Sequence, residues 1–463
     1  MRRAALLLLA AALLLGGFLR FTDLGRLEMS DDEGASWAAA AEPTVADVIA
    51  AQARLNPGKM AVHEIALHEW MAMFGNGIVA QRALSALLGT LSIVIVFWIG
   101  WELCALRIGR DDAGAAMIAA LGALVYAVNL VTIKYTREAR MYPVMLTATL
   151  LQVGFFVRAT RRGGILNYIG TAIFAIVAIS ANFAAALVPF SEGLWLLYLL
   201  ARSGIRPQSA ESRRAWSLLA ALAIAAMVFF ALSMSALRCA AGAVERGAIG
   251  WIKLPEPWAP VALFNKATGS FGFPVLLLVG AWGAIRGWRR ERDAVAFSLL
   301  WMWGPPVLMV IVSYAMQPLF VERYAISSFA PFFILVGIGI WKLEQPRRQI
   351  AALAIVVAVS LGHIAVFNRK AHDAQWREAA VLGVANLRGG ETMTAVPAYS
   401  ISVVRYYLPQ TDRGRTIDFM RGSSDASVVL LRDHGVSPSV DSAIHQEYPV
   451  ELAHLRGVIV LRK

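Results

Sequence analysis

The sequence predicts a mainly α-helical protein that crosses a membrane many times and ends in a small soluble α/β domain. Its 463 residues are 58% hydrophobic and 16% charged, whereas soluble domains are about 45–50% apolar and about 25% charged. The apolar residues also gather into runs of roughly 20, the length at which a helix crosses a bilayer. These two observations indicate an integral membrane protein.

About eleven apolar runs are long enough to span a membrane. No small-x-small cleavage site follows the first run, so we expect an uncleaved helix there rather than a signal peptide. The division inside 165–200 depends only on Ser180-Ala181-Asn182 and Pro189. The expected spans are 4–20, 83–101, 114–133, 141–157, 165–181, 183–200, 216–236, 270–286, 294–314, 325–341 and 350–367.

Basic residues fall in alternate loops between these runs. The 43 Lys and Arg residues outnumber the 31 Asp and Glu residues, but short clusters between apolar runs indicate membrane topology rather than nucleic-acid binding. The positive-inside rule then predicts that the loops 21–82 and 237–269 and the tail from 368 lie outside the cytoplasm. An error of one helix in the count would move that tail to the inside.

Short helices are expected within the first outer loop. Residues 44–56 and 60–74 carry apolar side chains at helical spacing with polar interruptions, which is typical of helices lying in the membrane interface. We assign this loop to a transmembrane module that covers residues 1–367.

The tail reads as a soluble domain over 368–463. Residues 373–387 have the pattern of an amphipathic helix, which Gly389-Gly390 ends. Short apolar runs then predict strands near 392–396, 427–431 and 457–461.

An acidic cluster, Asp31-Asp32-Glu33, follows the first span. Uncompensated carboxylates beside hydrocarbon are costly. The cluster is therefore either a solvated loop, in which Ser30 or an Asp caps a helix that begins near Gly34, or a site built to receive a proton or a cation. Charge alone leaves both interpretations open.

Lys59 and His63 are candidate substrate contacts later in the same loop. From the residues alone, interfacial anchoring and an ordinary polar surface are the favoured explanation for them and for His68. A metal site of His63, Glu64 and His68 is a further alternative at helical spacing, but the run lacks the His-Glu-x-x-His pattern of zinc enzymes.

Residues 134–142 contain Lys134, Arg137 and Arg140 in a loop that the topology places outside. Interfacial arginines can simply extend toward lipid headgroups. Their position is nevertheless an exception to the charge rule, and the arginine fork matches the oxygens of a phosphate. With Glu138 and Tyr142 in the same segment, we expect an anionic ligand there.

Arg323 has the same character at the start of a late span. It lies between Glu322 and Tyr324. It is either a further phosphate contact or the partner of Glu322 or Glu138 in a structural ion pair.

These segments resemble the polytopic GT-C-type glycosyltransferases (glycosyltransferase families 39 and 83), a group that includes lipid A aminoarabinose transferases, protein O-mannosyltransferases and the Rhizobium lipopolysaccharide galacturonosyltransferases. Asp32-Glu33-Gly34-Ala35-Ser36-Trp37-Ala38 is similar to the Asp-Glu motif of their first outer loop. Asn56-Pro57-Gly58-Lys59 departs from their Pro-Pro pair. The remaining similar segments are Arg82 to Gly89, Arg137 to Tyr142, Glu322-Arg323-Tyr324 with Pro331, and Trp376 to Ala380.

The resemblance implies a hexosyl- or pentosyltransferase of the bacterial inner membrane whose active site faces the periplasm. A sugar would pass from a polyprenyl-phosphate donor to an envelope acceptor (lipid A, another glycolipid, a polysaccharide or a protein) with inversion. It implies no cofactor and no obligatory metal, although a divalent metal remains possible, and no nucleic acid. The acceptor hydroxyl would lose its proton to Asp32, or alternatively to Asp31, with Glu33 the third carboxylate.

The resemblance also implies roles for the other polar residues of these loops. The phosphate contacts would be Arg137, Arg140, Arg323, Lys59 and Lys134. The substrate contacts would be Tyr142, Tyr324, Glu138 and His63. Two alternatives from other classes are a flippase or transporter for an anionic lipid and a non-catalytic scaffold with the same fold.

Overall fold

The computed structural model describes residues 2–56, 59–105, 113–245, 252–369, 374–419, 425–433 and 436–463. They fold into two compact units. The first comprises residues 1–22, 57–63 and 83–369, and the second comprises residues 23–56, 64–82 and 370–463. The domain limits predicted from the sequence, 1–367 and 368–463, stay a prediction.

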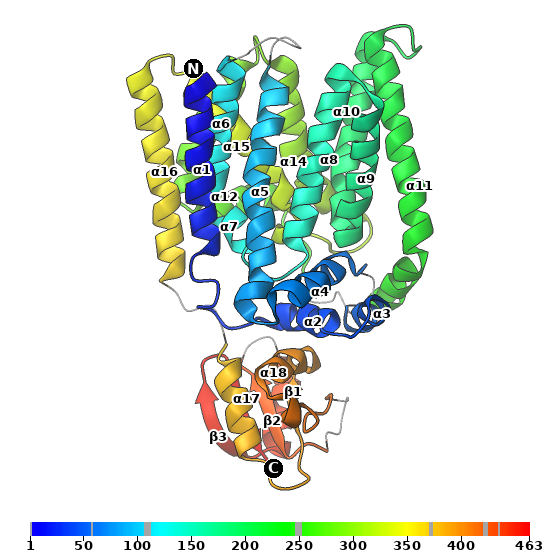
Figure 1. Cartoon of the computed structure of the whole chain (residues 1–463), viewed down its shortest axis with the longest axis vertical. Helices are drawn as coiled ribbons and strands as arrows, with labels where there is room; N and C mark the ends of the chain where they lie inside the picture. Colours follow the sequence, from blue (N-terminus) through cyan, green and yellow to red (C-terminus); the bar gives the residue numbers. More distant parts are fainter. Residues whose placement is uncertain are drawn as a thin grey trace. The chain divides into compact units, whose positions relative to one another are not determined.

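The first unit is helical (Figure 1). α5 begins in the second unit and continues into the first, and α4 begins in the first and continues into the second. The helices that lie wholly or largely in the first unit are α1 (Arg2–Phe21), α5 (Ile78–Cys104), α6 (Ala113–Ala127), α7 (Leu130–Tyr135), α8 (Tyr142–Arg162), α9 (Ile165–Ala181), η1 (Phe183–Ala186), α10 (Leu187–Ser203), α11 (Ala210–Glu245), α12 (Ala259–Thr268), α13 (Gly272–Gly287), α14 (Arg292–Ala315), η2 (Glu322–Ser328), α15 (Phe329–Trp341) and α16 (Pro346–Asn368).

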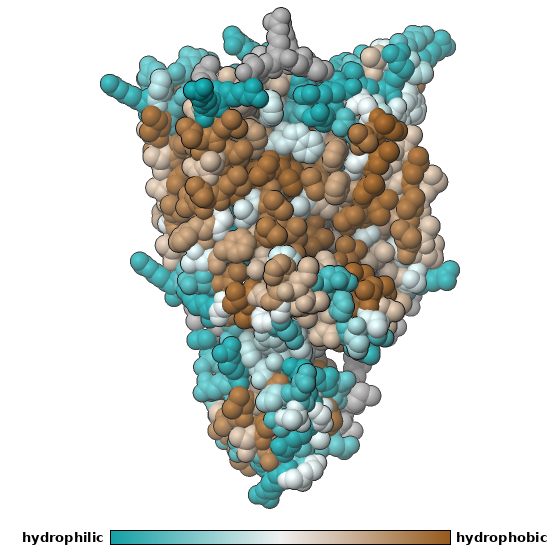
Figure 2. All heavy atoms as spheres, viewed as in Figure 1, coloured by the Kyte–Doolittle hydropathy of each residue, from teal (hydrophilic) through white to brown (hydrophobic). Residues whose placement is uncertain are grey.

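The prediction of a polytopic helical membrane protein is confirmed. Among the described residues, eight helices are long and apolar enough to cross a membrane, and α12 with α13, bent by 110°, make a ninth if they form one span. α6 and α9 are shorter apolar helices. Figure 2 shows hydrophobic side chains over the helices of this unit. Leu7, Leu166 and Leu278 are more than 70% exposed, as expected of a surface that faces lipid.

The expected span 114–133 differs from the structure, because the helix breaks after Ala127. Asn129 causes the break: its side-chain oxygen accepts hydrogen bonds from the backbone N–H groups of Val131 and Thr132 and so caps a new short helix, α7. The chain thus turns just before the segment that carries Lys134, Arg137 and Arg140.

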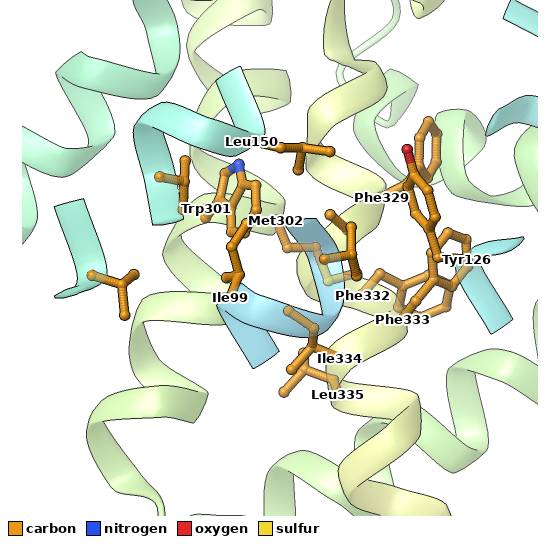
Figure 3. Close-up of a cluster of buried hydrophobic side chains, with 14 of the residues drawn as sticks. Ile99, Tyr126, Leu150, Trp301, Met302, Phe329, Phe332, Phe333, Ile334 and Leu335 are labelled. Atoms are coloured by element: carbon orange, nitrogen blue, oxygen red, sulfur yellow. The ribbon is translucent and has the colours of Figure 1, made fainter. Parts of the chain in front are cut away.

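The interior of the first unit is built from aromatic and small residues. Tyr126, Phe332 and Phe333 pack together, with the rings of Tyr126 and Phe333 6.2 Å apart (Figure 3). Elsewhere α13 and α15 touch at the backbone: a Cβ added to Gly339 would lie 2.0 Å from the carbonyl oxygen of Val279. Such close approach is the usual way in which helices associate in a membrane.

The basic loops gather at one end of the first unit. Arg158 and Arg162 both pair with Glu102. A cavity of about 330 Å³ at this end is lined by residues from five segments, including Arg161, Arg202 and Arg290. Three further ion pairs join the neighbouring loops: Arg202 with Asp293, Arg286 with Glu344, and Lys342 with Glu291. The alternation of basic loops predicted from the sequence therefore agrees with the arrangement of the helix ends.

The second unit combines the long loop after the first span with the C-terminal residues. Its helices are α2 (Asp31–Ala40), α3 (Val45–Leu55), most of α4 (Val62–Phe74), α17 (Trp376–Ala385), η3 (Ala398–Ser400), α18 (Ile401–Tyr407), α19 (Gln410–Arg413) and α20 (Pro438–Glu447). α3 and α4 lie where the sequence predicts short helices, and α17 lies within the helix predicted at 373–387.

A four-stranded sheet completes the second unit in the order β1-β2-β4-β3. β1 and β2 are parallel, and the other pairs are antiparallel. Three of the strands were predicted, but β3 was not, because this edge strand is largely exposed and carries no buried apolar run. The strands are β1 (Met393–Val396), β2 (Val428–Arg432), β3 (Val450–Leu455) and β4 (Val458–Arg462).

Candidate functional site

The acidic cluster forms the first turn of α2, in the second unit. Ser30 is its N-cap: the Ser30 hydroxyl accepts from the backbone N–H of Glu33, and the Glu33 carboxylate accepts from the backbone N–H of Ser30. This capping box is the structural interpretation that the sequence left open. The three carboxylates nevertheless differ in surroundings: Asp31 is half-buried, Asp32 is exposed and Glu33 is buried.

Glu33 is held by Arg82. The Arg82 Nε and Nη2 atoms donate to the two Glu33 carboxylate oxygens, each at 2.8 Å. The remaining Arg82 donors reach the carbonyl oxygens of Leu24, Leu27 and Glu28 at 2.7–2.9 Å. With both of its oxygens occupied, Glu33 fixes the entry into α2 rather than offering a free carboxylate.

Asp31 faces the C-terminal part of the same unit. Its carboxylate lies 2.9 Å from the Arg432 guanidinium at the end of β2. Burial raises the pKa of Asp31, and the neighbouring Asp32 carboxylate adds to this, whereas Arg432 and the Ser400 hydroxyl oppose it. Asp31 is thus a poorly solvated carboxyl next to one cation.

Asp32 points to the exposed side of the same turn. Its two neighbours are each held by an arginine, Asp31 by Arg432 and Glu33 by Arg82, whereas Asp32 itself is exposed. An exposed carboxylate on an anchored turn is accessible to a substrate hydroxyl, as a general base has to be.

The segment predicted to bind an anion lies in the first unit. Arg137 donates from Nη2 to the carbonyl oxygen of Thr22 at 2.5 Å, and Arg140 is buried, with 2% of its surface exposed. The Lys134 ammonium lies 5.1 Å from the ring centre of Tyr135 and 5.8 Å from that of Phe367. Glu138 is half-buried in the same turn.

Arg323 lies against the aromatic residues of this segment. Its guanidinium is 5.5 Å from the ring centre of Tyr142, and the rings of Tyr142 and Tyr135 meet edge to face at 5.7 Å. Burial raises the pKa of Tyr135, to which Glu138 and Glu322 add and which Arg323 opposes. Tyr135 is therefore a protonated phenol that can donate a hydrogen bond.

A cavity of about 470 Å³ opens beside these residues. Its polar lining comes from Tyr135, Lys253, Lys266, Glu322 and Arg323, and Lys266 lies 2.6 Å from Glu322. Its apolar lining comes from 252, 254–255, 259, 262–263 and 320–321. A pocket with cations on one wall and aliphatic residues on another suits an amphipathic anion.

Arg323 is the predicted phosphate contact that lines this pocket. Lys59, His63 and Tyr324 belong to the same unit, where His63 is buried and the other two are half-buried. Of the proposed metal ligands, Glu64 accepts from the Ser36 hydroxyl and His68 bonds to the carbonyl oxygen of Ala40. No three His, Cys, Asp or Glu side chains among the described residues are grouped so as to hold a metal ion.

Sequence reasoning missed Lys253 and Lys266. The signal was available, because both lie in a loop that the topology places on the side where basic residues are depleted. It also missed the roles of Arg82 and Arg432, whose partners lie far away in the sequence and can be found only from the fold.

No protein-family model matches the sequence, and no curated protein matches it. Two solved structures of ArnT from Cupriavidus metallidurans are similar in fold, one in the apo state (TM-score 0.59, 13% identity) and one bound to undecaprenyl phosphate (TM-score 0.60, 12% identity). Each similarity covers 98% of this chain and 97% of the ArnT chain.

The oligosaccharyltransferase of Archaeoglobus fulgidus, solved with Zn and sulfate, is also similar, with a TM-score of 0.54 at 12% identity over 96% of this chain and 68% of its own. This chain has the GT-C-type fold. The resemblance inferred from short motifs is thereby confirmed at the level of fold. The similarity to ArnT extends over nearly the whole length of both chains.

Proposed function

We propose that this GT-C-type protein is a glycosyltransferase that moves a hexosyl or pentosyl group from a polyprenyl-phosphate donor to an envelope acceptor. The acceptor is lipid A, another glycolipid, a polysaccharide or a protein. The reaction takes place on the periplasmic side of the bacterial inner membrane, with inversion and without an obligatory metal.

The pocket beside Tyr135 carries this proposal. Lys253, Lys266 and Arg323 supply three positive charges at the end of the first unit away from the clustered basic loops. Basic residues are depleted on the outer side of membrane proteins, so their presence there needs a ligand. The aliphatic wall suits the first isoprene units of a lipid whose phosphate meets the cations.

The fold comparisons support the same ligand class. One ArnT structure holds undecaprenyl phosphate, a polyprenyl phosphate. A lipid of this kind, carrying a sugar on its phosphate, is the donor that the pocket would accept.

The leaving group gives the cations their catalytic role. Cleavage converts a phosphodiester with one negative charge into a monoester that carries up to two. Lys253, Lys266 and Arg323 therefore bind the departing phosphate more strongly than the intact donor, which lowers the barrier. Tyr135 adds a neutral donor, and Lys59, Lys134, Arg137 and Arg140 would add to the positive field.

The acceptor hydroxyl needs a base, and we assign this role to Asp32, with Asp31 as the alternative. The hydroxyl loses its proton as its oxygen forms the bond to the anomeric carbon, and the bond from that carbon to the phosphate oxygen breaks. Glu33 is committed to Arg82 and positions the turn. Tyr142, Tyr324, Glu138 and His63 remain proposed substrate contacts.

A strain that lacks this protein tests the proposal. We expect mass spectrometry of its envelope glycolipids and polysaccharides to show the loss of one sugar, with the polyprenyl-phosphate sugar accumulating in the lipid extract. The wild-type gene should restore the sugar. Loss of the sugar with the lipid-linked donor confined to the inner leaflet would favour a flippase instead, and an unchanged envelope would contradict the proposal.

A further inference from the structure

The first turn of α2 is held by the C-terminal residues of its own unit. A Cβ on Gly34 would lie 2.9 Å from the backbone nitrogen of Val403, so the two backbones touch. The Trp37 and Tyr406 rings meet edge to face at 5.2 Å. The backbone N–H of Met29 donates to the Tyr407 hydroxyl at 2.7 Å. The carboxylate segment is thus positioned by helix α18.

One of these contacts reaches a carboxylate directly. The Arg432 guanidinium lies 2.9 Å from Asp31, whose side chain is 11% exposed, whereas that of Arg432 is 37% exposed. The Arg432 Nη1 atom also faces the Tyr399 hydroxyl at 3.4 Å. Arg432, at the end of β2, therefore contacts both Tyr399, which precedes Ser400, and Asp31 of the acidic turn.

We propose that Arg432 is a positioning residue for sugar transfer, which pairs with the Asp31 side chain and keeps it oriented beside Asp32. This inference rests on the proposed function. It gives the C-terminal residues a part in the chemistry, beyond the stabilisation of the fold, although they touch no reacting atom themselves.

The groups that act on Asp31 come from three elements. Arg432 at the end of β2 and the Ser400 hydroxyl of η3 favour the ionised form, whereas the Asp32 carboxylate in α2 disfavours it. Burial disfavours it most. Removal of Arg432 takes away the larger of the two effects that favour the ionised form and leaves the Ser400 hydroxyl, so Asp31 takes up a proton at higher pH than in the wild type.

A protonated Asp31 changes the turn in two ways. It no longer pairs with β2, so the side chain is free to rotate. It also removes the negative charge next to Asp32, and with it the repulsion that makes a carboxylate in such a pair a better proton acceptor. Both changes lower the rate of proton removal without touching the donor pocket.

The chain offers a matched control in Arg405. Arg405 pairs with Asp418 at 3.0 Å in the same unit, and its side chain is 35% exposed. Arg432→Gln and Arg405→Gln therefore remove one half-exposed arginine each from an ion pair, but only the first pair contains a carboxylate of the α2 turn.

The experiment measures transfer by the full-length protein in proteoliposomes as a function of pH for the wild type, Arg432→Gln, Arg432→Lys and Arg405→Gln. We expect Arg432→Gln to lower kcat about 10- to 100-fold near neutral pH, with an unchanged KM for the lipid-linked donor. Its acid limb should move to higher pH. Arg432→Lys should restore most of the rate, and Arg405→Gln should behave as the wild type.

The double variant Asp31→Asn/Arg432→Gln protects the test against a general loss of folding. If Arg432 acts through Asp31, the double variant is no slower than Asp31→Asn alone, because the two residues form one interaction. Additive losses, or an unmoved acid limb in Arg432→Gln, would overturn the inference while leaving the proposed function intact. A wild-type protein that transfers no sugar would overturn both.

Discussion

Arg82 shows how a single residue organises the acidic turn. Its side chain makes five hydrogen bonds, two to Glu33 and three to backbone carbonyl oxygens of the preceding loop. The side chains of Arg82 and Glu33 are 7% and 2% exposed. A buried ion pair is not necessarily stabilising in itself, but the loss of one partner leaves the other charge buried without compensation.

We therefore expect Arg82→Ala to destabilise the second unit by about 3–5 kcal/mol. Thermal unfolding of the purified protein in detergent measures this. Arg54→Ala is the control, because Arg54 is 73% exposed and 3.7 Å from Glu42, and such surface pairs contribute about 0–1 kcal/mol. Equal midpoints for the two variants would show that the Arg82 contacts do not hold the turn.

We expect the free energy of unfolding to depend on pH through Asp31. Its pKa is raised in the folded protein, mainly by burial, so the folded state binds this proton more tightly than the unfolded state does. Stability due to this group is complete at a pH below the unfolded pKa and is lost as pH rises through the folded pKa. Asp31→Asn removes that decline, since asparagine carries no charge at any pH.

The measurement is the unfolding midpoint of the wild type and Asp31→Asn across the acid range. The gap between them should widen in favour of the variant as pH rises. A variant that becomes relatively less stable with rising pH would mean that the Arg432 ion pair outweighs burial.

At the scale of elements, the proposed donor pocket depends on the break between α6 and α7. Asn129 stops one helix and starts the next, which brings Tyr135 at the end of α7 to the same pocket as Lys266 of α12 and Arg323 of η2. A continuous helix over 114–133 would carry Tyr135 in another direction.

Lys266 of α12 and Glu322 of η2 carry opposite charges, so we expect their substitutions to affect ligand binding differently. Lys266→Gln should weaken binding of undecaprenyl phosphate about tenfold, which is roughly 1.4 kcal/mol. Glu322→Gln should not weaken it, because it removes a negative charge from the same wall. Titration of the detergent-solubilised protein measures both, with Arg213→Gln in the exposed first part of α11 as the control. A similar loss in Lys266→Gln and Arg213→Gln would contradict the assignment of the pocket.

The packing of α2 on α18 leads to a prediction about backbone contact. In Gly34→Ala the new methyl group would meet Val403 Cγ2 at 2.4 Å and its backbone nitrogen at 2.9 Å. We expect a loss of about 1–3 kcal/mol together with a slower transfer reaction, because the acidic turn shifts. Gly389→Ala, with no atom within 4 Å of the added Cβ, should leave both the midpoint and the rate unchanged. Normal transfer by Gly34→Ala would contradict the required position of α2.

At the scale of the whole molecule, the helical membrane architecture followed from the sequence because a span has a fixed length and an apolar surface. Asn129 broke one expected span, since a single side-chain cap inside an apolar run gives almost no hydropathy signal. β3 escaped detection because an edge strand with exposed residues lacks a buried apolar run.

The candidate site was predictable where it violated a rule of composition. Arg137, Arg140 and Arg323 stood out as basic residues on the predicted outer side, where such residues are depleted, and the same criterion applied to the predicted outer loop 237–269 would have found Lys253 and Lys266. The contacts of Arg82 and Arg432 were not predictable. Each arginine joins segments that only the folded chain brings together. The residues next to Arg82 and Arg432 in the sequence do not indicate which carboxylate each arginine contacts.

The most direct test of the central claim is the fate of the lipid-linked donor on incubation with the purified protein. The reaction contains an envelope extract from the deletion strain, which supplies both the lipid-linked donor and the unmodified acceptor, and mass spectrometry follows the polyprenyl-phosphate sugar. Our account predicts conversion to free polyprenyl phosphate by the wild type, a loss of at least about 100-fold in Asp32→Asn, and normal conversion by Asp441→Asn in the first turn of α20. A donor that stays intact with the wild-type protein, or equal conversion by Asp32→Asn, would contradict the account.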